Sequence, residues 1–166
     1  WGKIDITLNL VGKHNVYNAL AAAANGLTLG FKIDAIKAGI ESVGVVPGRL
    51  EKVDCGQDFH VYIDFAHTHQ ALQIVLSTLR ETTKGRILLV FGCGGDRDRK
   101  KRPKMGHIAE KYSDLFWITS DNPRSEDPHN IIDEIQKGVR RKACSRVQAD
   151  RRIAIEEAIL EAKNGD

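Results

Sequence analysis

The sequence is poor in cysteine and in long apolar runs. Its three cysteines are an odd number and lie far apart, which argues against a disulfide framework and a zinc ribbon. The longest uninterrupted apolar stretches, residues 19–24 and 87–91, are far shorter than the roughly 20 residues of a membrane-spanning helix. No basic stretch followed by an apolar segment opens the chain, as in a secretory signal. We therefore expect a cytoplasmic protein with no membrane partner.

Aromatic residues are also scarce, at 6% of the chain, and none lies within its most basic stretch. Six lysines and arginines occur between residues 97 and 104, although the net charge of the whole chain is only +3. Proteins that bind single-stranded nucleic acid interleave basic and aromatic side chains, because the bases stack on the aromatic rings. The basic stretch therefore favours small anionic ligands over nucleic acid.

The overall composition is that of an ordinary globular protein, with 42% apolar and 28% charged residues. A disordered chain would contain too few apolar groups to offset the entropy of ordering it. The 166 residues suffice for one domain with its own core, or for one domain and a fragment of a second. The chain starts at Trp1 rather than at a methionine and ends on the turn-forming residues 164–166, so we expect a piece of a longer protein.

The first part of the chain predicts a strand and two helices. Apolar and polar residues alternate over residues 4–10, which is typical of a half-buried strand. Apolar residues at helical spacing then predict helices over residues 15–29 and 34–43. A glycine- and proline-containing stretch at residues 44–48 interrupts the pattern. We place a domain boundary there, with residues 1–46 as the remnant of a second α/β domain.

From residue 47 onward, strands and helices are expected to alternate. The pattern predicts four strands, over residues 59–63, 87–91, 115–119 and 146–149. Each is followed by a helix-start signal, namely Thr68, Pro103, Pro128 and Asp150. Such βα units in series predict an α/β fold for residues 47–166: a doubly wound, Rossmann-like, mostly parallel sheet with helices on both faces.

The loops after the strands contain the residues that could bind a ligand. In doubly wound sheets, ligands bind beyond the carboxyl ends of the strands, which places residues 64–68, 92–99 and 120–124 on one rim. The glycines of residues 92–95 could let backbone N–H groups approach an anion, or could simply allow a tight connection. The segment is neither a dinucleotide-binding fingerprint nor a Walker A loop.

Residues 120–124 combine acceptors, donors and a guanidinium. Asp121 and Asn122 could bind an ammonium or amide group, Arg124 could bind a carboxylate, and Pro123 would stiffen the turn. An ordinary turn with a solvated arginine is the alternative. Elsewhere, the histidines of residues 67–69 lack a third metal ligand at a recognisable spacing. Asn15 and Asn18 face one side of a helix start, where they could also serve as caps.

Five segments stand out in order along the chain: residues 14–18 (HNVYN), 47–51 (PGRLE), 64–68 (DFAHT), 92–98 (GCGGDRD) followed by KRPKM at 101–105, and 121–124 (DNPR). Taken together, these segments resemble those of the Mur ligases, the ATP-dependent amide-forming enzymes of peptidoglycan synthesis. Within the family, the DNPR tetrapeptide is associated with enzymes that select meso-diaminopimelate over lysine. The resemblance implies that residues 1–46 end a central ATPase domain and that residues 47–166 belong to the C-terminal, acceptor-binding domain.

The resemblance also implies roles for individual residues. Asn15 and Asn18 would approach the adenine of ATP, Arg49 its phosphates and Asp64 its ribose. The diamino acid would be held by Arg97, Asp121, Asn122, Pro123 and Arg124. The implied reaction uses ATP and Mg²⁺ to form an acyl phosphate on UDP-N-acetylmuramoyl-L-alanyl-D-glutamate, which the meso-diaminopimelate amine then attacks. No catalytic residue or metal ligand is expected within this chain, which we expect to be inactive by itself.

The sequence departs from the family pattern at several points. Phe65 replaces the usual tyrosine, and His69-Gln70 stands where the family has proline and aspartate. The upstream P-loop and the late motif that completes the diamino-acid site are both absent from the chain. Three alternatives stay open: a related ligase that adds lysine or glutamate, a non-catalytic anion-binding module, and a basic RNA-binding domain.

Overall fold

The computed structural model describes residues 3–166, and the chain divides into two compact units. Unit 1 contains the chain up to Cys55 together with Val61–Phe65, whereas unit 2 contains Gly56–His60 and Ala66–Asp166. The predicted boundary between residues 46 and 47 concerns the domains of a longer protein and stays a prediction.

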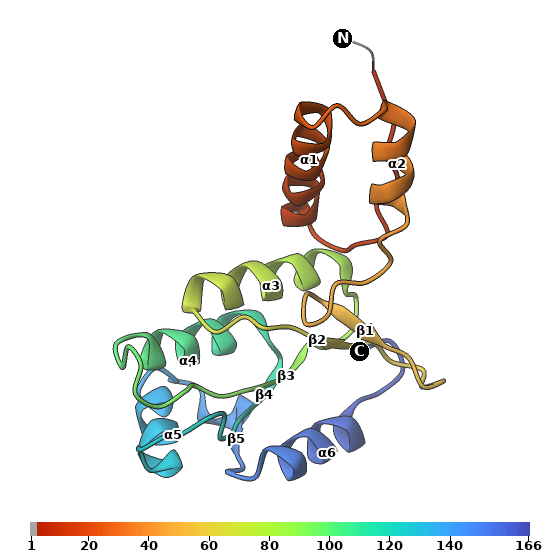
Figure 1. Cartoon of the computed structure of the whole chain (residues 1–166). Helices are drawn as coiled ribbons and strands as arrows, with labels where there is room; N and C mark the ends of the chain where they lie inside the picture. Colours follow the sequence, from red (N-terminus) through yellow and green to blue (C-terminus); the bar gives the residue numbers. More distant parts are fainter. Residues whose placement is uncertain (1–2) are drawn as a thin grey trace. The chain divides into compact units, whose positions relative to one another are not determined.

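Unit 1 contains two helices and a short hairpin. Helices α1 (Lys13–Thr28) and α2 (Ile33–Glu41) confirm the two predicted helices with slightly shifted ends, and they lie side by side (Figure 1). A Cβ atom at Gly26 would lie 2.9 Å from Ile36 Cγ1, so glycine lets the two helices approach closely. Gly30, with φ of 80°, forms the left-handed turn that ends α1.

The predicted strand over residues 4–10 is wrong, because the structure has no regular secondary structure there. The segment is held instead by the end of α2: Thr7 N–H donates to Glu41 Oε1 (2.9 Å), and Asn9 Nδ2 donates to the Glu41 carbonyl (2.9 Å). A strand exists only when a neighbour pairs with it. Within residues 3–166, every strand that forms pairs elsewhere, so the alternation alone produces no strand.

The hairpin pairs β1 (Glu51–Val53) with β2 (Val61–Ile63) in antiparallel register, with Glu51 opposite Ile63. β2 confirms a strand within residues 59–63, but its expected place in the parallel sheet is wrong. An alternating pattern identifies a strand without identifying its partner. Here the partner is β1, a three-residue strand that the sequence did not predict.

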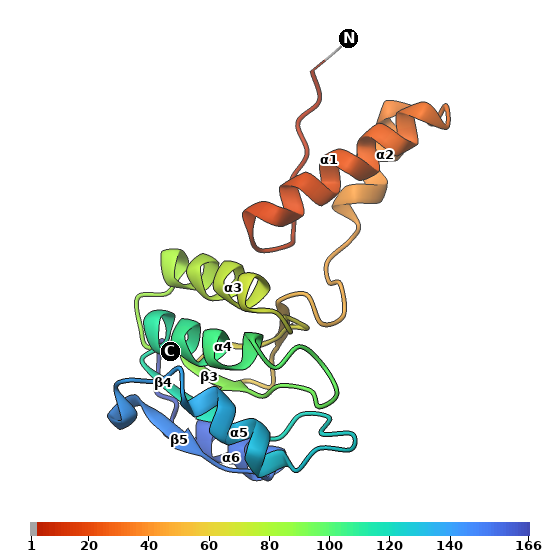
Figure 2. The same ribbon diagram turned by 90° about the vertical axis from the view of Figure 1, so that its left-hand side faces the viewer.

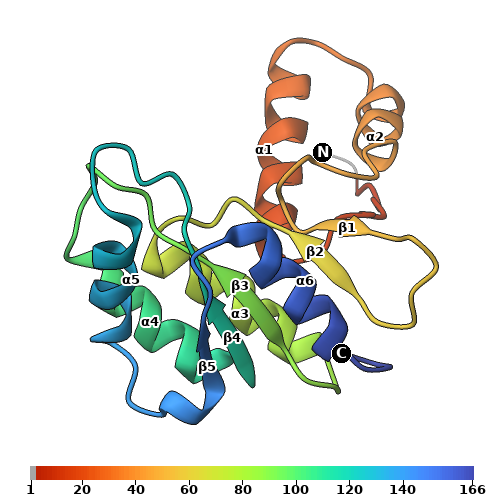
Figure 3. The same cartoon turned by 90° about the horizontal axis from the view of Figure 1, so that it is seen from below.

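Unit 2 is a parallel α/β fold. Its sheet has the order β3 (Leu88–Phe91), β4 (Leu115–Ile118) and β5 (Ser145–Val147), so it has three strands rather than the expected four. Around it are α3 (His69–Thr82), α4 (Lys101–Tyr112), α5 (Pro128–Gln136) and α6 (Arg151–Glu161), with a short 3₁₀ turn, η1, at Lys142–Cys144. Figure 2 shows α3 beside α4, and Figure 3 shows α6 running alongside β3.

Unit 2 has buried apolar side chains on both faces of its sheet. Phe116 and Ile118 of β4 pack with apolar residues of α3, α4 and α5, including Met105 and Ile135. Trp117, which points to the opposite face, packs with Ala154 and other residues of α6. Each of these side chains is at most 1% exposed. The α/β fold with helices on both faces of a parallel sheet is therefore confirmed.

Three of the four sequence signals for helix starts in unit 2 are confirmed, and the signal at Pro103 is two residues late. Thr68 Oγ1 accepts from Ala71 N–H (3.2 Å) at the start of α3, and Asp150 accepts from Arg152 N–H (2.9 Å) at the start of α6. α5 begins at Pro128 as predicted, whereas α4 begins at Lys101, ahead of Pro103. Over residues 3–166, none of these helices combines the length and apolarity needed to cross a membrane.

Cys93 lies in this core at the end of β3. Its side chain is 3% exposed, and its Sγ lies 3.5 Å from Met105 Sδ. Burial raises the pKa of the Cys93 thiol to about 11, so the thiolate is disfavoured at neutral pH. The residue is a packing element of the core.

Candidate functional site

Two loops follow neighbouring strands and meet at the carboxyl edge of the sheet. They are residues 92–100, after β3, and residues 119–127, after β4. Gly95 N–H donates to the Asn122 carbonyl (2.8 Å), and Arg124 Nη1 donates to the Gly95 carbonyl (2.6 Å). The shared rim predicted for these two loops is therefore confirmed. The third predicted member, residues 64–68, is divided between the two units.

The glycines of the first loop permit its close approach to the second. A Cβ atom at Gly95 would lie 1.8 Å from the Pro123 carbonyl oxygen, and one at Gly92 would lie 2.4 Å from the Thr119 carbonyl oxygen. Neither glycine has a positive φ, so backbone freedom is not the reason for them. The interpretation as a tight connection accounts for both.

Two non-glycine residues in these loops adopt the left-handed conformation, which is uncommon for L-residues. They are Asp96, with φ of 52°, and Arg124, with φ of 50°. The Asp96 carboxylate accepts from Ser125 N–H (3.2 Å) and from Ser125 Oγ (2.7 Å), and Asp96 N–H donates to Glu126 Oε1 (2.7 Å). Side chains and backbone of both loops thus hold each other in a conformation that the isolated segments would disfavour.

A fully buried guanidinium lies beneath the two loops. Arg102 of α4 forms a fork with Glu126, through Nη1 to Oε2 (2.8 Å) and Nη2 to Oε1 (2.7 Å). Its Nη1 also donates to Glu134 Oε2 (2.9 Å), and its Nη2 donates to the Gly94 carbonyl (3.3 Å). Two hydrogen bonds to the Glu126 carboxylate lower its pKa to about 2: the larger effect comes from Arg102 and the smaller from Asp96 N–H. At neutral pH the fork is therefore charged on both sides.

This network corrects the interpretation of the basic stretch. Arg102 belongs to the stretch predicted to bind external anions, but it is 0% exposed and bonds to carboxylates of its own chain. Arg99 likewise pairs with Glu134, and Lys101 Nζ donates to the His67 carbonyl (2.6 Å). Glu126 and Glu134 were missed because they lie far along the sequence from Arg102, where no local pattern links them.

The residues predicted to hold the diamino acid come together on this rim. Arg97, Asp121, Asn122 and Arg124 are exposed, and Pro123 is half-buried. Two guanidinium groups and one carboxylate therefore border the same edge, an arrangement that can pair with the carboxylates and the ammonium groups of an amino acid. Their binding role stays a prediction.

Two of the predicted nucleotide-binding residues meet at the turn before β1: Arg49 lies within this turn, and Asp64, which follows β2, bonds to it. Gly48 and Leu50 have positive φ, and Leu50 N–H donates to Asp64 Oδ2 (2.9 Å). Glu51 Oε2 accepts from Gly48 N–H (2.8 Å), which leaves Arg49 exposed at the tip of the turn. The Asp64 carboxylate therefore shapes the turn that presents Arg49, in addition to any role in binding ribose.

The other two predicted nucleotide-binding residues lie at the start of α1. Asn15 is 4% exposed; its Nδ2 donates to the Val11 carbonyl (2.8 Å), and its Oδ1 accepts from Asn18 Nδ2 (3.1 Å). The Asn15 amide is thus engaged in shaping the helix start, whereas Asn18 is exposed. Beside them, His14 Nδ1 is buried without a hydrogen-bond partner among residues 3–166.

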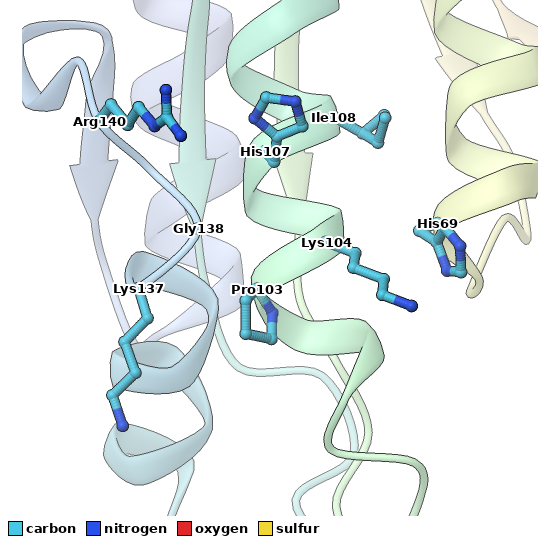
Figure 4. Close-up of a pocket in the computed structure, with 8 residues that line it drawn as sticks. All are labelled: His69, Pro103, Lys104, His107, Ile108, Lys137, Gly138 and Arg140. Atoms are coloured by element: carbon cyan, nitrogen blue, oxygen red, sulfur yellow. The ribbon is translucent and has the colours of Figure 1, made fainter.

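A basic hollow of about 460 Å³ lies on the outer side of α4. It is lined by His69, Pro103, Lys104, His107, Ile108, Lys137, Gly138 and Arg140 (Figure 4). Lys104 points toward His69, whereas Lys137 points away from His107, so the cations do not converge on one point. In the part of the chain that the structure describes, no group of three or more His, Cys, Asp or Glu side chains could hold a metal ion.

Comparison with known proteins places this geometry in a family. Residues 48–166 match the family model described as Mur ligase, glutamate ligase domain. A UDP-N-acetylmuramoyl-L-alanyl-D-glutamate–2,6-diaminopimelate ligase from Syntrophomonas wolfei is 53% identical over 163 residues, which are 97% of this chain and 33% of that protein. The chain spans about a third of the length of the curated relatives it matches.

Solved structures agree with this result. A UDP-N-acetylmuramoyl-L-alanyl-D-glutamate–2,6-diaminopimelate ligase is similar over 99% of this chain and 34% of its own, with a TM-score of 0.70 and 35% identity. A Mycobacterium tuberculosis folylpolyglutamate synthase complexed with ADP and AMPPCP is similar over 95% of this chain and 35% of its own, with a TM-score of 0.72 and 28% identity. On the match of residues 48–166, the chain belongs to the Mur ligase family.

Proposed function

We propose that this chain is part of an ATP-dependent ligase that joins meso-diaminopimelate to UDP-N-acetylmuramoyl-L-alanyl-D-glutamate in peptidoglycan synthesis. The observation that carries the proposal is the convergence of Arg97, Asp121 and Arg124 on one rim, in a chain 53% identical to a ligase named for that reaction. As part of a larger enzyme, the chain would supply the acceptor-binding loops and would contribute to binding ATP.

The chemistry of the acceptor supports this assignment. Meso-diaminopimelate carries two ammonium and two carboxylate groups, so its site needs both guanidinium donors and carboxylate or carbonyl acceptors. Arg124 would pair with the distal carboxylate, and Asp121 would accept from an ammonium group. Binding by several fixed groups would hold the attacking amine near the activated glutamate, which accelerates the reaction by proximity.

ATP would be held in part by residues of unit 1. The exposed Arg49 guanidinium suits a phosphate, and the exposed Asn18 amide offers both a donor and an acceptor to the base. Asp64 and Asn15 would act mainly through the turn and the helix start that they shape. Mg²⁺, with ligands from the remainder of the enzyme, would neutralise phosphate charge.

The similarity to a folylpolyglutamate synthase favours a second candidate, a ligase that adds glutamate. Glutamate and lysine each lack part of the diaminopimelate structure: lysine lacks the distal carboxylate, and glutamate lacks the distal ammonium group. A comparison of the three acceptors therefore tests the proposal directly.

The test uses the full-length parent enzyme, with each amino acid as acceptor. We expect product with meso-diaminopimelate and little with lysine or glutamate. Arg124→Ala should raise the KM for meso-diaminopimelate by about tenfold or more, corresponding to about 1.4 kcal/mol, with little change in the KM for ATP. Arg124→Lys should restore only part of the loss, because an ammonium cannot form the two-pronged pair.

Arg151→Ala is the matched control. Arg151 is also exposed, and its Nη1 donates to the Ser120 carbonyl (3.3 Å), in the loop that contains Arg124. The variant therefore removes an arginine–carbonyl hydrogen bond at this loop without removing a predicted ligand. We expect an unchanged KM for meso-diaminopimelate in this variant. Equal use of lysine by the parent enzyme, or an unchanged KM in Arg124→Ala, would contradict the proposal.

A further inference from the structure

The two acceptor loops share one internal support, the buried guanidinium of Arg102. It contacts the Gly94 carbonyl of the first loop and the Glu126 carboxylate of the second. A third partner, Glu134 of α5, fixes the guanidinium from below. Because Arg102 is 0% exposed, no external ligand competes for these contacts.

The contacts continue from Arg102 to residues next to the predicted ligands. Glu126 Oε1 accepts from both Arg102 and Asp96 N–H, and Asp96 precedes Arg97. Asp96 in turn accepts from Ser125, which follows Arg124. A shift of Glu126 would therefore release the backbone on which both exposed arginines are carried.

We propose that Arg102 is a positioning residue of the acceptor site, which sets the spacing between Arg97 and Arg124 through Glu126. The identity of the acceptor rests on the proposed function, whereas the positioning itself rests on the contacts described above. Arg102 touches neither substrate nor nucleotide in this assignment, and it acts only through the loops.

The geometry requires arginine at this position. The two parallel bonds to Glu126 and the third bond to Glu134 need a planar fork, and an ammonium is a point donor that cannot match both carboxylates at these angles. Arg102 Nε is buried without a partner among residues 3–166, so the side chain gives up one hydrogen bond to keep this orientation. A buried charge that loses such partners is strongly unfavourable.

The first experiment measures amide hydrogen exchange on the present chain. In Arg102→Lys, exchange at the Asp96 and Gly95 amides should accelerate by about tenfold or more, because both loops lose their support. Glu126→Gln is a milder change that keeps the shape of the side chain, and it should accelerate exchange at the same amides. It replaces Arg102→Lys in the experiment if that variant does not fold. Unchanged exchange at these amides in a folded variant would overturn the proposal.

Arg86→Lys is the matched control. Arg86 precedes β3 at the opposite end of the strand, where it also bonds to several acceptors, including Asp166 (2.7 Å) and the Glu161 carbonyl (2.9 Å). This variant should destabilise unit 2 without accelerating exchange at Asp96. If Asp96 exchange accelerates to the same extent in both variants, Arg102 stabilises unit 2 as a whole rather than the two loops, and the proposal is overturned.

The second experiment measures kinetics in the full-length parent enzyme. Arg102→Lys should raise the KM for meso-diaminopimelate by about tenfold or more, because small displacements of positioning groups are costly, while the KM for ATP and for the UDP-linked substrate stays unchanged. An equal rise in all three KM values, or none, would overturn the proposal. A wild-type parent enzyme that does not use meso-diaminopimelate would instead overturn the proposed function, and the exchange experiment would still decide the role of Arg102.

Discussion

Unit 1 and unit 2 differ in how far they bury their apolar side chains. In unit 2, Phe116 and Ile135 are 0% exposed, within a core that extends over four helices and the sheet. In unit 1, Leu20 of α1 is 60% exposed and Phe31 is 59% exposed. Leu50 is the one buried apolar side chain among the described residues of unit 1.

The difference extends to the helix ends. Side chains cap α3, α5 and α6 of unit 2, whereas α1 and α2 begin without a side-chain cap. α4 of unit 2 also begins without a side-chain cap, but it packs within the core. Packing and satisfied backbone N–H groups therefore stabilise three of the four helices of unit 2, whereas the helices of unit 1 depend more on helix propensity. We infer that unit 2 accounts for most of the free energy of unfolding of this chain.

The largest expected effect comes from removing a core side chain. Phe116→Ala should lower the free energy of unfolding of unit 2 by about 3–5 kcal/mol, because it leaves a cavity between β4 and its covering helices. Leu20→Ala, in the exposed part of α1, should change the free energy of unfolding of unit 1 by less than about 0.5 kcal/mol. Urea unfolding followed by circular dichroism would measure both, and similar losses in the two variants would contradict the difference between the units.

A smaller effect is expected at a helix start. Asp150 accepts from Arg152 N–H and Ile153 N–H, so Asp150→Ala should cost about 1 kcal/mol of stability. Asp34→Ala, in the first turn of the uncapped helix α2, should cost only about 0.3 kcal/mol through the helix dipole. The same urea titration tests this pair, and the comparison fails if Asp34→Ala costs as much as Asp150→Ala.

The third effect concerns acid. The pKa of Glu126 is lowered from 4.5 to about 2 in the folded state, so its contribution to stability is present above pH 4.5 and is lost as the pH falls toward 2. The urea midpoint of unit 2 should fall over this range, and Glu126→Gln should make the fall less steep. Glu156→Gln, on the exposed surface of α6, is the control; a pH profile unaffected by Glu126→Gln would contradict the prediction.

Local signals predicted most of unit 2. The caps at Thr68 and Asp150 and the proline at the start of α5 each act within a few residues, so the sequence reveals them directly. Buried strands such as β3 and β4 were recognisable because their apolar runs are continuous. The rim shared by the two loops followed from the rule that parallel strands end at the same edge.

The errors concern partners that lie far apart in the sequence. The alternation at residues 4–10 indicated a strand but could not show that no neighbour would pair with it, and β2 was assigned to the wrong sheet for the same reason. The burial of Arg102 depends on Glu126 and Glu134, which only the fold brings together. Charge counted along the chain therefore overstated how many cations face solvent.

The burial of Cys93 gives unit 2 a chemical reporter of its own opening. Cys55, in unit 1, is exposed, whereas the Cys93 thiol is both buried and held protonated by its raised pKa. An alkylating reagent at neutral pH should modify Cys55 quickly and should reach Cys93 only in molecules whose core has opened. The rate at which Cys93 gains the label, followed by mass spectrometry, would then time the opening of unit 2 in the native protein without denaturant.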